Sequence, residues 1–146
     1  MEQPLFTLIN AITQLSSLNH ADLSALLDRS FSPTEKQSEY FMVYELTHYP
    51  LADTTHLLDF DLREPIPGSG ATAGPLLNMD VKGSCITRDQ VNSHYGDLTL
   101  SGVPRGHSPE EEWVLETNRG RYKLSFGFKE RQPDCLAGVT IADSTR

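Results

Sequence analysis

The sequence predicts an α+β fold with N-terminal helices and an antiparallel sheet, in the order α-α-β-β-β-α-β-β-β. Apolar residues at helical spacing open the chain, and runs of β-branched and aromatic residues with short turns between them follow. Strands joined by short turns pair antiparallel, and helices grouped ahead of strands are typical of α+β domains. The chain has 146 residues, the usual size of one domain, so residues 1–146 are expected to form a single domain.

Two helices are predicted before residue 30. Between Leu5 and Leu15 the apolar residues recur at helical spacing, which gives a broad apolar face. The second helix starts within "LNHADLSALLDR", where Asn19 is the predicted N-cap and Asp22 lies in the first turn, where a carboxylate suits the helix dipole.

A third helix is predicted from "ITRDQVNSHYG". Thr87 is its N-cap, Gln90 completes a capping box, and Gly96 supplies a left-handed C-terminal stop. The second and third helices share this pattern, and each is followed by Ser-Pro and then by strands. We interpret the pattern as an internal duplication, with halves 1–63 and 76–146 joined by a loop rich in Pro and Gly, residues 64–75.

The strands are predicted from residue pattern. "EYFMVYEL", "PLLNMDVKG" and "DCLAGVTIAD" read as strands, and "EWVLETNRGRYKLSFGFKE" reads as a hairpin turning at "NRG". In "HLLDFDLRE" the apolar side chains of Leu58, Phe60 and Leu62 are expected to face the core. The helices should cover that face, and the opposite face should carry the charged residues Asp59, Asp61, Arg63, Lys123 and Lys129.

Composition and charge narrow the function classes. The formal net charge is −8, and because an acidic surface repels phosphate backbones we expect no nucleic-acid partner. Such a surface attracts a basic protein instead. No apolar run approaches the roughly 18 residues of a membrane span. No Lys or Arg precedes Arg29, so the basic segment of a signal peptide is missing. The expected location is the periplasm if a signal peptide was removed from this chain, and otherwise the cytoplasm.

The two cysteines, Cys85 and Cys135, allow three interpretations: a disulfide, two free thiols, or a nucleophilic Cys85. His94 cannot be the base of such a nucleophile, because it lies about 10 Å or more along the predicted helix. The five histidines form no metal-binding motif, so neither a metal nor a cofactor is expected. Asp59 and Asp61 are read as the solvated side of a strand instead of paired catalytic carboxylates. We therefore predict no catalytic residue and no enzyme activity.

One segment is the candidate binding surface. "GDLTLSGVPRGHSPEEEW", residues 96–113, is a long connection, and long loops in compact domains are often functional. The hypothesis is that it docks a partner whose cleft is basic; the alternative is a solvated loop leading into a strand. The predicted contact residues are Arg105, His107, Glu110, Glu111 and Glu112.

The segment "CITRDQVNSHYG", followed by a loop and strands, resembles the repeat of the β-lactamase-inhibitor-protein and small outer-membrane lipoprotein class. The small acidic chain is also similar to bacterial immunity proteins, including those paired with type VI secretion effectors. That resemblance implies a non-catalytic protein that blocks a secreted toxin enzyme by occluding its active site. A periplasmic accessory or assembly protein is the first alternative, and a small α+β enzyme is the second.

Overall fold

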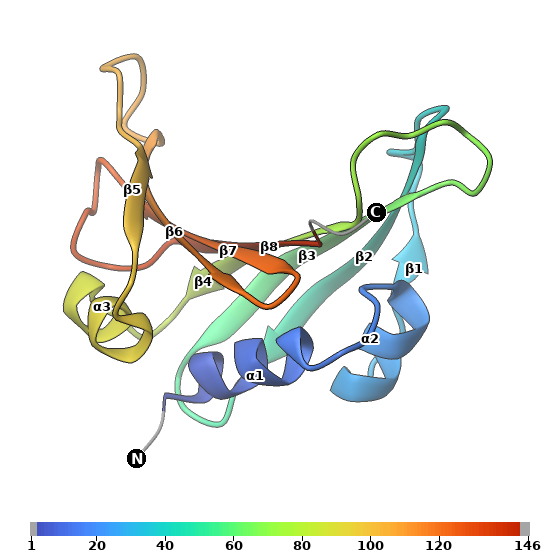
Figure 1. Cartoon of the computed structure of the whole chain (residues 1–146). Helices are drawn as coiled ribbons and strands as arrows, with labels where there is room; N and C mark the ends of the chain where they lie inside the picture. The colour runs from blue at the N-terminus through green and yellow to red at the C-terminus, as the bar shows by residue number, and fades with distance from the viewer. Residues whose placement is uncertain (1–2, 144–146) are drawn as a thin grey trace.

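The computed structural model describes residues 3–143, in which three helices lie on one side of an eight-stranded antiparallel sheet (Figure 1). The helices are α1 (Pro4–Thr13), α2 (His20–Leu27) and α3 (Arg88–Tyr95). The strands are β1 (Ser32–Pro33), β2 (Phe41–Pro50), β3 (His56–Pro65), β4 (Leu76–Lys82), β5 (Thr99–Gly102), β6 (Glu112–Arg119), β7 (Tyr122–Lys129) and β8 (Gly138–Asp143). Their order across the sheet is β1-β2-β3-β4-β8-β7-β6-β5. The α+β class is thus confirmed.

The predicted element order lacks two strands that the structure contains. The short strand β1 includes Pro33 and pairs with β2, and β5 pairs with β6 inside the segment that was expected to be a continuous loop. Both are edge strands held by backbone pairing to one neighbour, and all but one of their residues are exposed. Strands this short and this exposed have no alternating apolar pattern, which is why sequence inspection missed them.

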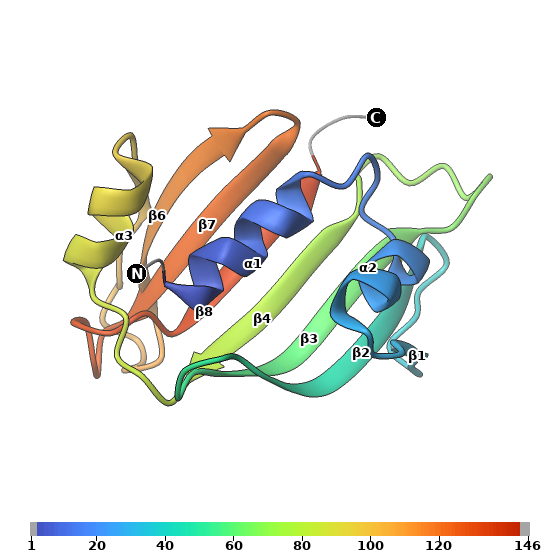
Figure 2. The ribbon, with the colours of Figure 1, turned by 90° about the horizontal axis from the view of Figure 1, so that it is seen from below.

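The core lies between the helices and the sheet. Register pairs bring Leu62, Leu77, Ile141 and Leu124 side by side across four strands, all fully buried. Helix α1 runs along the middle of the sheet, over β8 and β4 (Figure 2), and contributes the buried residues Leu5, Phe6, Ile9 and Ile12. The Tyr122 hydroxyl donates a hydrogen bond of 2.7 Å to the carbonyl oxygen of Leu15, which fixes the chain after α1 to β7.

The helix caps follow the sequence prediction. The Asn19 side chain accepts a hydrogen bond from the backbone N–H of Asp22 at 2.8 Å. Thr87 and Gln90 form the expected capping box, in which each side chain accepts from the other's backbone N–H. The C-caps of α2 and α3, Asp28 and Gly96, both adopt the left-handed conformation. Local capping chemistry therefore sets where these helices begin and end.

The predicted alternation in β3 is wrong at one position. Leu57 is fully buried and Leu58 is half-buried, although Leu58 was expected in the core. The cause is a β-bulge: Asp59 has φ +51°, and the pairing between β3 and β4 shifts by one residue between Leu58 and Asp61. An extra residue in a strand reverses the side-chain alternation beyond it, so Leu57 takes the inward place.

The loop of residues 66–75 connects β3 to β4, two neighbouring strands of the same sheet. Strand β4, which follows it, pairs with β3 on one side and with β8 on the other. The sheet is therefore continuous from the N-terminal strands to the C-terminal strands, and the loop does not divide it.

The disulfide interpretation of the cysteines is the one that the structure shows. Cys85 and Cys135 are bonded, with their Cα atoms 4.9 Å apart. They join the segment before α3 to the segment before β8, where the backbone N–H of Leu136 also donates to the carbonyl oxygen of Ile86 at 2.8 Å. Neither thiol is free to act as a nucleophile in this state.

Candidate protein-binding surface

No helix of residues 3–143 covers the side of the sheet opposite the three helices, and we call this side the open face. Figure 1 shows the three helices below the sheet, with the loops of residues 66–75 and 103–111 rising on the other side at its two ends. The open face thus forms the floor between two raised loops. Asp61, Arg63, Lys123 and Lys129 lie on it, as their alternation with buried neighbours predicted.

One row of side chains crosses the middle of the open face, and we call it the polar row. Register pairs define its members from β2 to β6: Glu45, Asp61, Asn78, Thr140, Ser125 and Glu116. Its centre is uncharged, with the Thr140 hydroxyl donating to the Asn78 side-chain oxygen at 2.7 Å. Carboxylates lie at both ends of the row. A partner docked on the open face would therefore contact uncharged polar side chains at the centre and acidic side chains at both margins.

Lysines partly neutralise these margins. Lys36 Nζ lies 3.2 Å from Glu45 and 3.8 Å from Asp61, and Lys123 Nζ lies 3.2 Å from Glu116. Burial raises the pKa of Asp61 above its usual value, and Lys36 opposes that rise. The pairs are solvent-exposed at their lysine ends, so each contributes little to folding stability and remains open to exchange for a partner's cation.

A second acidic group lies beside the polar row. Gly127 and Gly138 are paired neighbours on β7 and β8, and a Cβ atom on Gly127 would overlap the carboxylate of Glu112. Glu112 therefore occupies the space that these glycines leave. The Cβ position of Gly138 would be 4.0 Å from Glu112 Oε2 and 4.0 Å from Asp80 Oδ1, so both carboxylates lie near this glycine, and the charge of Asp80 acts on Glu112.

Crowding changes the acidity of this pair. Burial raises the pKa of Asp80, the charge of Asp59 raises it further, and Lys129 and Lys82 oppose both effects. Burial likewise raises the pKa of Glu112, with Lys129 lowering it and Asp80 raising it. Both groups are thus destabilised as anions in the free protein, and a cation supplied from outside would relieve them.

Two of the predicted contact residues, Glu110 and Glu111, form hydrogen bonds within the chain. Glu110 is bound within the chain, to Lys129 Nζ at 3.0 Å and to Arg131 Nε at 2.5 Å, and these bonds lower its pKa. Glu111 shapes the loop, because one carboxylate oxygen accepts from the backbone N–H groups of Arg105, His107 and Ser108. Those bonds hold its pKa below the usual range.

The remaining predicted residues are oriented toward solvent or toward the sheet. Arg105 and His107 are exposed, and their backbone N–H groups make the bonds to Glu111. Glu112 begins β6 and points onto the open face. The structure therefore brings Glu112 together with Asp80, a residue that sequence inspection did not select. Its alternation with the buried Met79 and Val81 was the available signal.

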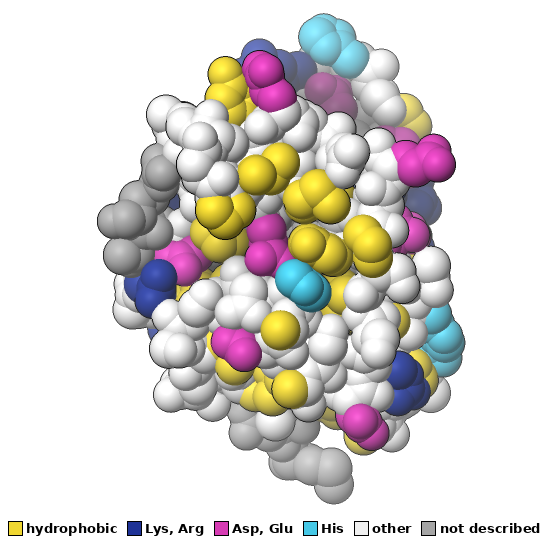
Figure 3. All heavy atoms as spheres, turned by 90° about the vertical axis from the view of Figure 1, so that its right-hand side faces the viewer, with side chains coloured by type: hydrophobic (Ala, Val, Ile, Leu, Met, Phe, Trp, Pro, Cys, Tyr) yellow, Lys and Arg dark blue, Asp and Glu magenta, His cyan; other side chains and the backbone are white. Residues whose placement is uncertain are grey.

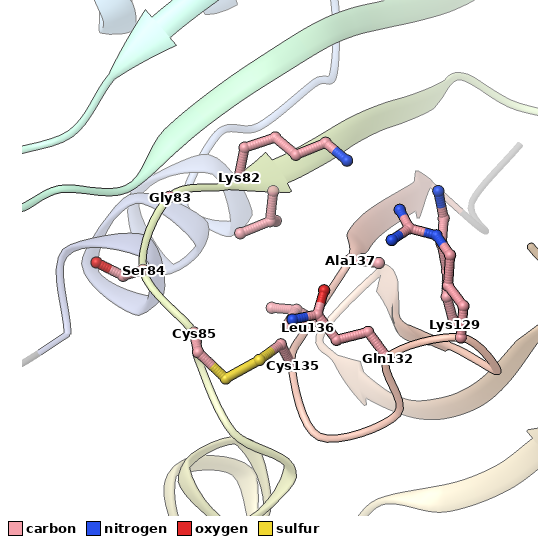
Figure 4. A pocket seen from close by; sticks show the side chains of 11 residues that line it. Lys82, Gly83, Ser84, Cys85, Lys129, Gln132, Cys135, Leu136 and Ala137 are labelled. Atoms are coloured by element: carbon pink, nitrogen blue, oxygen red, sulfur yellow. A yellow bond between two sulfur atoms is a disulfide. The ribbon is translucent and has the colours of Figure 1, made fainter.

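A pocket of about 120 Å³ lies beside the disulfide (Figure 4). Lys82, Lys129 and Arg131 contribute to its lining, along with Cys85 and Cys135. Two of these cations are already bonded to Glu110. The pocket thus belongs to the ion-pair network that anchors the 103–111 loop.

Comparison with protein-family models, with curated proteins and with solved structures gives no significant match. Among residues 3–143 no group of three or more His, Cys, Asp or Glu side chains is arranged to hold a metal ion. No helix in that part of the chain is long and apolar enough to cross a membrane.

Asp80→Asn is expected to stabilise the fold at neutral pH, by up to about 0.5 kcal/mol, the usual size for a partly exposed position. The folded-state pKa of Asp80 is raised, so the folded protein binds this proton more tightly than the unfolded chain does. The cost of ionising Asp80 is present above the raised pKa and is relieved as the pH falls through it. The difference between variant and wild type should therefore be largest at neutral pH and vanish below the ordinary aspartate pKa.

Urea unfolding between pH 3 and pH 8 measures this difference. Asp134→Asn is a suitable control, because Asp134 is exposed and its side chain makes no hydrogen bond or ion pair within residues 3–143. A constant difference across the pH range would contradict the expectation.

Proposed function

We propose that this chain is a non-catalytic binding protein of the immunity or inhibitor type, which occludes the active site of a bacterial toxin enzyme with its open face. The observation that carries the proposal is the uncovered sheet face between the loops of residues 66–75 and 103–111. A protein interface of standard size buries roughly 800 Å² on each partner. With strands about 4.8 Å apart and a rise of about 3.3 Å per residue, the bare face of this eight-stranded sheet has an area of this order.

Charge supports a basic partner. The chain has a formal net charge of −8, and the open face holds Asp80 and Glu112 with raised pKa values. A lysine or arginine brought against these carboxylates would favour their charged forms. Long-range attraction would also speed the encounter, more strongly at low salt. We propose that Arg105 and His107, which are exposed on the 103–111 loop, also contact the partner.

The disulfide supports both the non-catalytic role and the compartment. Cys85 is bonded to Cys135, which removes the free thiol that a nucleophilic Cys85 would need. Disulfides of this kind persist in oxidising compartments such as the periplasm. The periplasm is also where an immunity protein would meet a toxin directed against the cell envelope, and we propose it as the working location.

We also propose that the fold arose by internal duplication. The strand order from β1 to β4 is mirrored by that from β5 to β8, with β4 and β8 meeting at the centre. The same number of residues separates the N-caps Asn19 and Thr87 as separates the C-caps Asp28 and Gly96. These observations favour halves that divide after β4, later in the chain than the 64–75 loop.

Ser125→Arg tests the proposed interface. Ser125 lies in the centre of the polar row, has a small side chain, and makes no side-chain hydrogen bond within the described residues. An arginine there adds bulk and positive charge to the middle of the open face. We expect inhibition of the toxin encoded beside this gene, or of a toxin captured from the same cells, to weaken at least tenfold.

Ser93→Arg is the matched control, because Ser93 is exposed on α3 in the helix layer. It should inhibit like the wild type. Equal loss in both variants would contradict docking through the open face. A purified chain that binds no toxin from its own neighbourhood would contradict the inhibitor proposal and favour the accessory-protein alternative.

A further inference from the structure

Arg63 lies on the open face, where its guanidinium packs against an aromatic ring. Its guanidinium lies over the ring of Phe41, 4.4 Å from the ring centre. Its Nε is buried and has no hydrogen-bond partner. Within residues 3–143 the Arg63 side chain forms no ion pair, although the chain is strongly acidic. Buried polar atoms are nearly always paired in folded proteins, so a buried Nε without a partner calls for an explanation.

The neighbours of Arg63 explain why it has no carboxylate. Register pairs place Val43 and Leu76 on either side of it, and both are apolar. The next charged residue on the same face of β3 is Asp61, which pairs with Lys36. Glu64 follows Arg63 in the sequence but bonds His20 on the helix side, at 2.5 Å. Arg63 thus has no carboxylate partner within the described part of the chain, because Asp61 and Glu64 are paired with other side chains.

A groove of about 270 Å³ lies against this guanidinium. Tyr40 and Phe41 line one part of it, and residues 70–73 of the loop line another. Tyr40 is 43% exposed, so much of this residue is accessible to a ligand. Figure 3 shows hydrophobic side chains gathered in the upper part of the side of the molecule where this loop lies.

The groove is held in shape before anything binds. The carbonyl oxygen of Tyr40 accepts from the backbone N–H of Ile66 at 2.8 Å and from the Ser69 hydroxyl at 3.3 Å. The side chain of Ala71 is buried, 8% exposed, which ties the loop to the body of the protein. Gly70, which lines the groove together with Arg63, has φ +82°, a conformation that favours glycine. A preformed groove costs little ordering entropy on binding.

We infer that this groove, which we call the Arg63 groove, receives a carboxylate side chain of the docked partner. A planar guanidinium with free N–H donors matches a carboxylate through two parallel hydrogen bonds. Arginine and tyrosine in well-packed pockets are the residues that most often dominate binding energy. This inference rests on the proposed function: the partner presents basic groups to Asp80 and Glu112 and one acidic group to Arg63, which sets its orientation on the open face.

The first test needs no partner. The labelled full chain is titrated with acetyl-Ala-Glu-Ala-amide and with acetyl-Ala-Gln-Ala-amide, and NMR follows the Arg63 Nε–H and the amides of Gly70 and Ala71. We expect the Glu peptide to bind at least threefold more tightly than the Gln peptide, with the difference shrinking at high salt. Equal binding of both peptides, or an unmoved Arg63 resonance, would overturn the inference.

Two variants make the titration specific. Arg63→Gln should abolish the preference for the Glu peptide, whereas Arg29→Gln should retain it. Arg29 is the matched control because it also lies over an aromatic ring, that of Tyr49, at 5.6 Å, but is exposed and outside the groove. A chain ending at Asp143 tests the chain's own C-terminus as occupant. Much tighter peptide binding by this shorter chain would show that the C-terminus fills the groove, and would overturn the inference.

The toxin assay separates this inference from the proposed function. If a toxin binds, Arg63→Gln should weaken the complex at least tenfold and Arg29→Gln should not. If wild type and Arg63→Gln bind the toxin equally, the Arg63 groove does not receive a carboxylate of the toxin, whereas the proposed inhibitor role is unaffected. If no toxin binds the wild type, the inhibitor role fails, and the peptide titration alone decides whether the groove takes a carboxylate.

Discussion

Replacing both cysteines, Cys85→Ala with Cys135→Ala, is expected to lower the free energy of unfolding by about 4 kcal/mol. The disulfide spans a sequence separation of 50, and closing a loop of that length restricts the unfolded chain by roughly this amount on the chain-entropy model. The folded chain should otherwise change little, because Leu136 and Ile86 remain joined by a backbone hydrogen bond beside the lost bridge. Urea unfolding of the variant and the oxidised wild type measures the difference.

Wild-type protein treated with reductant is the internal control, and its unfolding midpoint should fall to that of the double variant. The loss should be similar at all pH values between 5 and 8, because a disulfide does not titrate. A midpoint within error of the oxidised protein would contradict the prediction. It would mean that the unfolded chain is already compact around this loop.

Phe60→Ala is expected to destabilise the fold by about 3–5 kcal/mol, the usual cost of truncating a buried phenylalanine. Phe60 is fully buried on β3, and its ring meets those of Phe31 and Tyr49 edge-on, at 6.0 and 6.3 Å between ring centres. The cavity would open where the segment after α2 packs against the sheet. This loss is large against the 5–15 kcal/mol that holds a typical domain.

Phe60→Leu is the control for this site, because it keeps most of the apolar volume and should cost distinctly less. Leu58→Ala gives a second comparison on the same strand. Leu58 is half-buried, so its truncation should also be milder than that of Phe60. If Leu58→Ala proved as costly as Phe60→Ala, the strand would lack the bulge at Asp59 and the sequence-based alternation would hold instead.

The helices were predictable because their signals are local. A capping box at Thr87 and Gln90, and an Asn cap at position 19, act over three residues of the same segment. The long strands were predictable from side-chain type. The bulge at Asp59 was not, because nothing in "HLLDFDLRE" distinguishes a regular strand from one with an extra residue. Cross-strand pairing with β4 decides between them.

The candidate surface was only partly predictable, for a related reason. Sequence inspection drew attention to the acidic run at positions 110–112, but two of those carboxylates are bonded within the chain, Glu110 to cations and Glu111 to backbone N–H groups. Which acids remain available depends on lysines and arginines that are distant in sequence. Asp80 and Glu112 come together only because β4, β8, β7 and β6 are neighbours in the sheet.

The unbroken pairing of β4 with β8 has a mechanical consequence. A two-domain protein can adapt to its target by bending at a hinge, whereas here one hydrogen-bonded sheet, with α1 lying along its middle, contains no interdomain hinge between β4 and β8. A protein that docks on the open face must therefore be complementary to a preformed surface. Little conformational freedom is then lost on association. The complexes with closely related targets should differ mainly in their dissociation rates.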